Sequence, residues 1–188
     1  MKYVFNLILL AVVCYLSYEL FKTVEEVVVF NKEKAIRDGA TIDKLKLLRR
    51  VQLAHKSDYQ LYADSFDKLK NFASDGNYKI LTKIGDPNDS TVVARVDTSL
   101  ISIVDSLFDG NKQVISELDV IPHSGGAKFQ IKADTINKND VIIPAFEIKA
   151  PYESVYNGLI EKYYAPKIGQ YMRVGSLEDG STSGNWGE

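Results

Sequence analysis

The side chains that most often carry out catalysis or bind metals are few in this chain and far apart. His55 and His123 are the two histidines, and Cys14 is the one cysteine. None of them stands at a spacing that forms a cysteine–histidine pair, a serine–histidine–aspartate triad or an HExxH zinc motif. No glycine-rich loop has the spacing that cradles phosphate. The sequence therefore predicts a chain that is not an enzyme, with no cofactor and no metal site.

Two acidic stretches are the remaining candidates for chemistry. Asp86, Asn88 and Ser90 alternate as in a calcium loop, but the glycine and the distant glutamate of that loop are missing, so turn formation explains them better. The second stretch could face a basic partner or the chain's own basic helix face, although solvated loops are the simpler interpretation. It comprises Asp97, Asp105, Asp109, Glu117 and Asp119, against Lys112.

The dominant feature is an almost uninterrupted apolar run over residues 3–21, with Asn6, Ser17 and Glu19 as its polar insertions. Roughly 20 helical residues, at about 1.5 Å each, cross the hydrocarbon core of a bilayer. The run therefore predicts a transmembrane anchor over residues 1–22. A cleaved signal peptide is less well supported because no small-x-small site comes after the run. Lipidation at Cys14 is disfavoured by the bulk of Val13 before it.

The end of this anchor is a candidate contact surface. Tyr15 and Tyr18 are typical of interfacial aromatic residues. Glu19 lies about one turn from the end, where its carboxylate can reach the headgroups; alternatively it pairs with a cation of a partner subunit. We expect Tyr15, Tyr18 and Glu19 to contact other subunits of a membrane complex.

Charge gives conflicting signals about orientation. Lys2 precedes the run, and Lys22, Lys32, Lys34 and Arg37 come after it, so the positive-inside rule alone would leave the domain in the cytoplasm. A signal-anchor with a short basic tail more often exports the domain on its C-terminal side. We expect a single-pass protein of the inner (cytoplasmic) membrane with a periplasmic domain, and a cytoplasmic domain is the alternative.

A helical stalk is predicted over residues 23–75. Apolar residues recur at helical spacing on one face of it, and Lys44, Arg49 and Arg50 lie on the other, where they could contact anionic lipid or be solvated. The β-branched residues 27–30 either continue the helix or break it, with Asn31 capping a restart. Gly39 is a second weak point, with Thr41 as a possible cap. A short helix over residues 65–72 ends the stalk. The predicted apolar face is Ile42, Leu45, Leu48, Val51, Ala54, Tyr59 and Tyr62.

Residues 76–174 alternate as short strands and predict a small α+β domain with a mainly antiparallel sheet. Pro144 indicates a strand edge or bulge, which makes that edge a third candidate contact surface. Residues 123–126 predict a hairpin loop, 105–108 a helical turn, and 151–163 a helix. The Gly/Ser-rich tail, residues 175–188, should be mobile unless Trp186 docks. The predicted strands are residues 78–84, 91–96, 99–104, 115–121, 127–133, 141–149 and 171–174.

Composition limits the partners further. The formal net charge is −2, so the chain as a whole has no electrostatic field that would attract nucleic acid. Partners are therefore expected to be other membrane-complex subunits, together with anionic lipid at the basic face.

Three segments resemble an uncharacterised family of single-pass membrane proteins from Bacteroidota: FNKEKAIRD, IDKLKLLRRVQLAHKSDYQLYADSFDKLKNF and MRVGSLEDGSTSGNWGE. That resemblance implies no activity for any residue. The layout, an apolar helix, an amphipathic continuation and a small sheet, is also similar to type IV pilins and type II secretion pseudopilins. It departs from them in having no prepilin peptidase site before the apolar run.

The expected fold class is α+β, with a transmembrane helix, an amphipathic stalk helix and a small antiparallel sheet domain. The expected function is a non-catalytic structural subunit of an envelope complex used in secretion, motility or a pilus-like machine. A pilin-like filament subunit and an envelope sensor or binding module are the alternatives.

Overall fold

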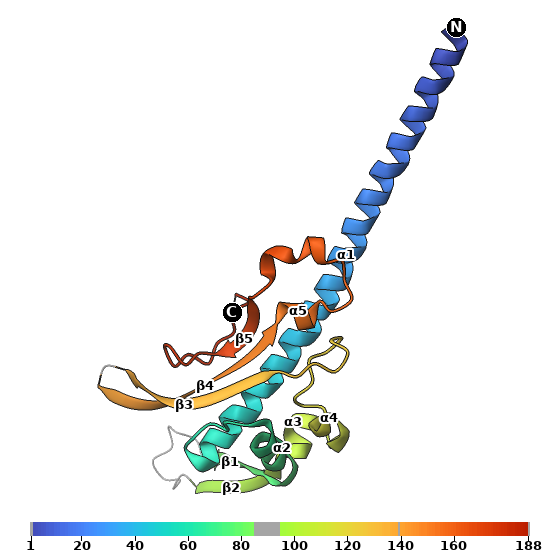
Figure 1. Cartoon of the computed structure of the whole chain (residues 1–188). Helices are drawn as coiled ribbons and strands as arrows, with labels where there is room; N and C mark the ends of the chain where they lie inside the picture. Colours follow the sequence, from blue (N-terminus) through green and yellow to red (C-terminus); the bar gives the residue numbers. More distant parts are fainter. Residues whose placement is uncertain (1, 85–94, 139, 188) are drawn as a thin grey trace.

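The computed structural model describes residues 2–84, 95–138 and 140–187, with side chains omitted for residues 78–101. The fold is α+β, as the sequence predicts. One long helix runs through the molecule, and every other element gathers around its C-terminal half (Figure 1). The predicted turn and calcium-like residues at 86–90, and most of the predicted strand 91–96, lie outside the described residues.

The long helix α1 extends from Lys2 to Tyr59 without a break. Of the two alternatives for residues 27–30, continuation of the helix is confirmed, and the restart capped by Asn31 does not occur. The possible cap at Thr41 is wrong, because Thr41 lies inside the helix. Tertiary packing explains the outcome: Phe30 is 7 % exposed and Thr41 is fully buried. Contacts with the domain thus keep this stretch helical, although the helix propensities of its residues alone would favour a break.

The C-terminal half of α1 forms one wall of the core. Leu45, Leu48, Val51 and Ala54 of the predicted apolar face are buried, while Tyr59 is exposed. The core continues through Phe146 and Ile148 of the sheet and Leu69 and Phe72 of the next helix, among others. Residues 2–25 of α1 are all exposed and have no such cover.

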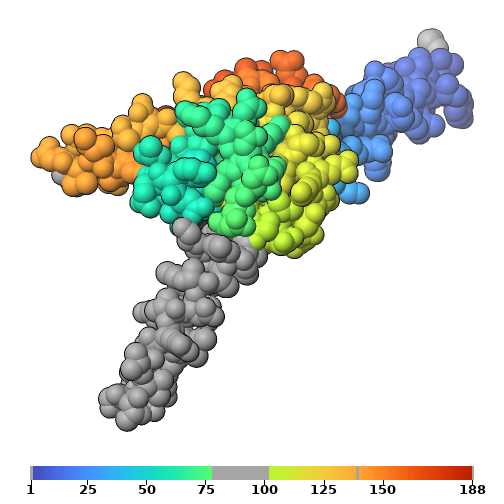
Figure 2. All heavy atoms as spheres, turned by 90° about the horizontal axis from the view of Figure 1, so that it is seen from below, coloured from blue at the N-terminus to red at the C-terminus, as the bar shows by residue number. Residues whose placement is uncertain are grey.

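A three-stranded antiparallel sheet packs on α1 in the order β3-β4-β5. Its strands are β3 (Gln130–Lys138), β4 (Val141–Pro151) and β5 (Tyr171–Gly175). The β3–β4 hairpin projects from the body (Figure 2), and its tip exposes Val141 and Ile142. A separate antiparallel pair is formed by β1 (Asn77–Ile84) and β2 (Arg95–Ser102). The predicted strands 78–84, 141–149 and 171–174 are thereby confirmed, and 127–133 begins later, at Gln130.

Three short helices close the far end of the core: α2 (Phe66–Asp75), α3 (Ile103–Phe108) and α4 (Lys112–Ser116). The predicted helix at 65–72 and the helical turn at 105–108 are confirmed. The predicted strand 115–121 is wrong, because Ile115 lies in α4 and turns come after it. The predicted strand 99–104 is right only to Ser102. The loop at residues 123–126 does join paired backbones, with Val120 opposite Lys128.

The predicted helix over 151–163 is also wrong beyond its first turn. Helix α5 covers only Tyr152–Val155, and two 3-10 turns come next, η1 (Glu161–Tyr163) and η2 (Ala165–Lys167). Gly158 has φ +80°, a left-handed conformation that ends a helix and that glycine adopts without strain.

The C-terminal tail folds back along β5. The Gly175 N–H donates to the Ser183 carbonyl (3.0 Å), and Asn185 N–H donates to the Arg173 carbonyl (3.1 Å). Trp186 packs, half-buried, against the core. The tail was expected to be mobile unless Trp186 docks, and Trp186 does dock.

A buried glutamine fixes the turn after α1. Gln52 is fully buried; its Nε2 donates to the Ala63 carbonyl (2.8 Å), and its Oε1 accepts from the Ala63 N–H (2.9 Å). Both backbone groups of one buried residue are thus satisfied by one side chain.

Replacing Gln52 by alanine leaves those two buried backbone groups without partners. We expect Gln52→Ala to lower the free energy of unfolding by about 2–5 kcal/mol. The measurement is urea unfolding in mild detergent, monitored by the fluorescence of Trp186. The exposed Gln113 supplies the control, and Gln113→Ala should change the value by less than about 0.5 kcal/mol. Equal effects of the two substitutions would contradict this role for Gln52.

Candidate membrane anchor and interaction surfaces

Residues 3–21 of α1 form a bare apolar rod. Its large side chains are all exposed, from Tyr3 at 89 % to Val12 at 48 %. Within the described residues, α1 is the one helix long and apolar enough to cross a membrane, by length and composition. Roughly 20 exposed, mostly apolar residues in water would carry a large hydration cost, so the rod calls for an apolar environment.

Tyr15, Tyr18 and Glu19 lie along one strip of this rod, because residues three and four apart share a helix face. Tyr15 is 63 % exposed and Tyr18 is 66 % exposed. Within the next turn, the Thr23 hydroxyl donates to the Glu19 carbonyl (2.9 Å). The strip is therefore free to contact lipid or another helix, and its predicted role as a partner surface stays a prediction.

Beyond the rod, α1 meets the segment on the C-terminal side of α5. The Lys162 ammonium contacts the Glu26 carboxylate (2.9 Å), and the Tyr163 hydroxyl donates to the same oxygen (3.2 Å). The hydrogen bond from Lys162 lowers the pKa of Glu26. One turn later, the Phe30 ring packs 5.1 Å from the Tyr163 ring, between centroids. These contacts form the first attachment of the domain to the helix.

A second attachment lies two turns further along. The Tyr156 hydroxyl donates to the Asp38 carboxylate (2.7 Å), which also accepts from Lys34 (2.7 Å). Arg37 donates to the carbonyls of Val155 (3.3 Å) and Asn157 (2.7 Å). Burial and then the Asp38 carboxylate raise the pKa of Tyr156 well above its usual range, so the hydroxyl stays protonated and donates. We call these contacts between residues 26–38 and 155–163 the clamp.

Sequence reasoning did not identify the clamp. The sequence marks Arg37 only as a positive charge near the apolar run, and it places Tyr156 only inside the predicted helix over residues 151–163. Asp38 and Tyr156 are 118 positions apart in the sequence, so local spacing carries no signal that they pair.

The predicted basic face of the stalk is divided between two contacts with the domain. Lys44 donates to the Glu117 carbonyl (2.6 Å), whereas Arg49 approaches the Thr182 carbonyl (3.5 Å), and both side chains are half-buried. Arg50 is exposed. Lys44 lies about 35 Å along the helix from Phe21, several Debye lengths from the end of the apolar run. If α1 crosses the membrane upright, this distance argues against contact between Lys44 and anionic lipid. Contact between the basic face and a partner protein stays a prediction.

The acidic stretch does turn toward basic groups of the same chain. The buried Asp119 carboxylate contacts the Lys70 and Lys128 ammonium groups, the latter at 2.8 Å. Burial acts to raise the pKa of Asp119, but the bonds from Lys128 and Lys70 outweigh it and hold that pKa below its usual value. Asp119 thus faces Lys70 of α2 and Lys128, whereas the Lys44 bond reaches the main chain of Glu117. Contact between the acidic side chains and the stalk's basic face stays a prediction.

Pro144 lies where the sheet is reduced to two strands. It pairs with Thr135 of β3, whereas β5 covers β4 only from Glu147 to Pro151. The free side of β4 at Pro144 is thus an edge, consistent with a residue that has no N–H to donate. Its use as a binding surface stays a prediction.

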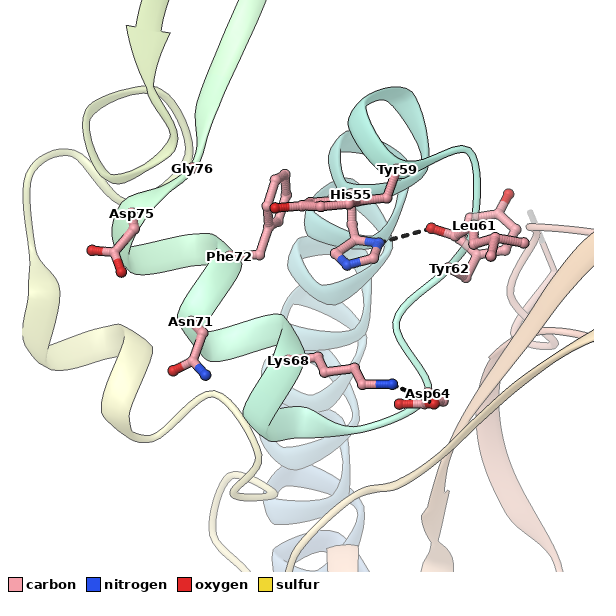
Figure 3. Close-up of a pocket in the computed structure, with 10 residues that line it drawn as sticks. All are labelled: His55, Tyr59, Leu61, Tyr62, Asp64, Lys68, Asn71, Phe72, Asp75 and Gly76. Atoms are coloured by element: carbon pink, nitrogen blue, oxygen red, sulfur yellow. Dashed lines mark hydrogen bonds and ion pairs between the residues drawn. The ribbon is translucent and has the colours of Figure 1, made fainter.

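A hollow of ≈ 660 Å³ lies between the end of α1 and α2 (Figure 3). His55 stacks on Tyr59 (4.7 Å between ring centroids), and its Nδ1 lies 2.7 Å from the Leu61 carbonyl oxygen. A carbonyl can only accept, so Nδ1 carries a proton and donates it. At the rim, Lys68 pairs with Asp64 (2.7 Å). The hollow has the volume to hold a small molecule.

Across the described part of the chain, no group of three or more His, Cys, Asp or Glu side chains is placed to hold a metal ion. No known protein-family model, curated protein or solved structure matches the chain. The exposed rod and its attachment to the domain through the clamp are the candidate functional feature.

The hydroxyl of Tyr156 can be tested alone. We expect Tyr156→Phe to lower the free energy of unfolding by about 1–3 kcal/mol, because Asp38 loses a hydrogen bond in a partly buried setting. Urea unfolding measures it. Tyr164→Phe is the matched control, since the Tyr164 ring packs on Tyr156 while its hydroxyl has no hydrogen bond within the described residues. A loss of stability in the control as large as that in Tyr156→Phe would rule out the bond as the cause.

The Asp119 ion pairs predict a dependence on pH. A carboxyl whose folded pKa is depressed contributes stability above its unfolded pKa of about 3.9, and this is lost as pH falls through the folded value. Unfolding at a series of pH values should therefore show stability falling below about pH 4. The fall should be shallower in Asp119→Asn than in Asp58→Asn, which changes an exposed residue. Identical profiles for the two variants would count against the contribution of Asp119.

Proposed function

We propose that this chain is a single-pass membrane protein whose tethered domain is a non-catalytic structural subunit of an inner-membrane envelope complex, with the domain in the periplasm. The observation that carries the proposal is the continuity of α1. The helix that exposes the apolar rod also supplies Leu45, Leu48 and Val51 to the domain core.

Continuity fixes where the domain can be. A helix of 58 residues is about 87 Å long, of which the hydrocarbon core takes about 30 Å. The clamp begins only a few residues past the rod, so no flexible linker separates lipid from domain. A rigid mount of this kind suits a subunit that presents surfaces at a set height. It is poorly suited to a domain that must diffuse to a substrate.

The arrangement also favours a second candidate, a pilin-like filament subunit. Such proteins are similar in layout, with a protruding apolar helix whose other half lies under an antiparallel sheet. Intact mass of the membrane-extracted protein distinguishes the two. An unprocessed Met1 supports the anchored subunit, whereas removal of the first residues with N-methylation supports the filament.

Membrane anchorage itself is tested by two arginines placed in the rod. Wild-type protein should stay in the membrane pellet after alkaline carbonate. The double variant Leu9→Arg/Val13→Arg should be released, because each arginine near a helix centre costs about 2.5–3.5 kcal/mol of insertion free energy. Leu53→Arg, which changes an exposed position of α1 within the domain, is the control and should stay in the pellet. Release of the wild-type protein would refute the anchor.

The structural role is tested by purification in mild detergent with mass spectrometry of the co-eluting proteins. Defined membrane subunits at fixed stoichiometry support it. A chain that elutes alone, yet retains a small molecule through purification, would favour a binding module instead.

A further inference from the structure

The domain has a segment at the level where the membrane surface would be. Residues 157–170, which we call the strap, lie closer to the N-terminal half of α1 than the rest of the domain does (Figure 1). The strap contacts Glu26, five residues after Phe21. Five helical residues span about 8 Å, and the headgroup layer of one leaflet is about 5–8 Å thick. With residues 3–21 in the hydrocarbon, the strap therefore reaches the headgroups.

The strap has the composition of an interfacial segment. Ile160 is 44 % exposed and Ile168 is 47 % exposed. Lys162 lies over the Tyr163 ring (4.6 Å to its centroid), and Lys167 lies over the ring of Tyr152 (4.2 Å). Exposed aliphatic side chains beside tyrosine rings and lysine stems are typical of surfaces that rest in a membrane interface.

Exposed apolar side chains continue from the rod toward the strap, between charged residues. Val24, Val28 and Val29 expose 54–60 % of their surface on α1 just past the rod. Between Val29 and the strap residue Ile160 lies a groove of ≈ 330 Å³, with Phe30 and Leu159 also lining it. An exposed apolar strip of this kind is unfavourable in water, whereas it is favourable where it faces acyl chains.

Electrostatic attraction contributes little at this place. Lys162 is paired with Glu26, and Glu25 and Glu33 border the same groove as Lys22. Positive and negative groups are thus nearly balanced. A surface of this kind has no need of anionic lipid.

We propose that the strap and its groove rest in the headgroup region of the bilayer, through apolar and aromatic contact with phospholipid of any charge. The inference rests on the proposed single-pass anchor. Contact on one side of α1 makes the strap a second support beside the span, which fixes how the domain is rotated about the helix and toward which side it leans.

The experiment uses nitroxide labels in the full chain, with Cys14→Ala as the cysteine-free background. The protein is placed as one copy per nanodisc in phosphatidylcholine. Labels are attached at Leu10→Cys in the rod, Ile160→Cys in the strap and Ile142→Cys at the exposed tip of β3–β4. Electron paramagnetic resonance then compares relaxation of each label by oxygen, which concentrates in lipid, with relaxation by a water-soluble nickel chelate.

We expect oxygen to dominate at positions 10 and 160, and the nickel chelate to dominate at position 142, with a several-fold difference in the ratio between 160 and 142. Ile168→Cys provides an independent second label in the strap. Replacing a third of the lipid with phosphatidylserine should leave the ratio at 160 within about twofold.

Three failures are distinguishable. If position 10 is in lipid while 160 and 168 behave as 142 does, the strap faces water or awaits a protein partner, and this inference is overturned while the anchor stands. If position 10 is itself accessible to nickel, the anchor fails and the inference falls with it. A ratio at 160 that requires phosphatidylserine would overturn the apolar contact in favour of an electrostatic one.

Discussion

The structure depends on one helix satisfying two different surroundings. Every backbone group in the middle of α1 is paired within the helix, so the chain can leave water without exposing unpaired N–H or C=O groups. Side chains alone then decide what surrounds each part. Aliphatic residues cover most of the circumference up to Phe21, whereas beyond Phe30 only one face is apolar, and the domain covers it. The change from one regime to the other takes place over about two turns.

The clamp lies at that change. Phe30 and Tyr156 provide buried apolar area, and Asp38, Lys34 and Arg37 provide hydrogen bonds that orient the domain around the helix. Charged groups held partly out of water bond more strongly and with narrower geometry than exposed ones. The clamp therefore fixes the orientation of the domain on α1 as well as holding the two together. Purely apolar contact would not fix that orientation.

Local pattern was a good guide wherever a local interaction decides the outcome. The apolar run, α2 with its inward Leu69 and Phe72, and the alternating strands β1, β4 and β5 agree closely with the sequence. Errors arose where distant contacts overrule local preference. Thr41 is suited to a cap, yet its burial keeps it inside α1. Ile115, Leu118 and Ile121 are β-branched or aliphatic, yet they fill the core from turns and a short helix. Gly158 ends the helix that Val155 and Leu159 alone would continue, and the Asp38–Tyr156 bond has no local signature at all.

The absence of a joint between rod and core has a mechanical consequence. With residues 3–21 in a bilayer, as proposed, α1 would act as a lever: a small tilt of the span would move the projecting tip of the β3–β4 hairpin over a much larger lateral distance. Helices lean more when the bilayer thins around them. Local bilayer thickness would then set the reach of Val141 and Ile142, so that lipid composition steers what the hairpin tip can touch.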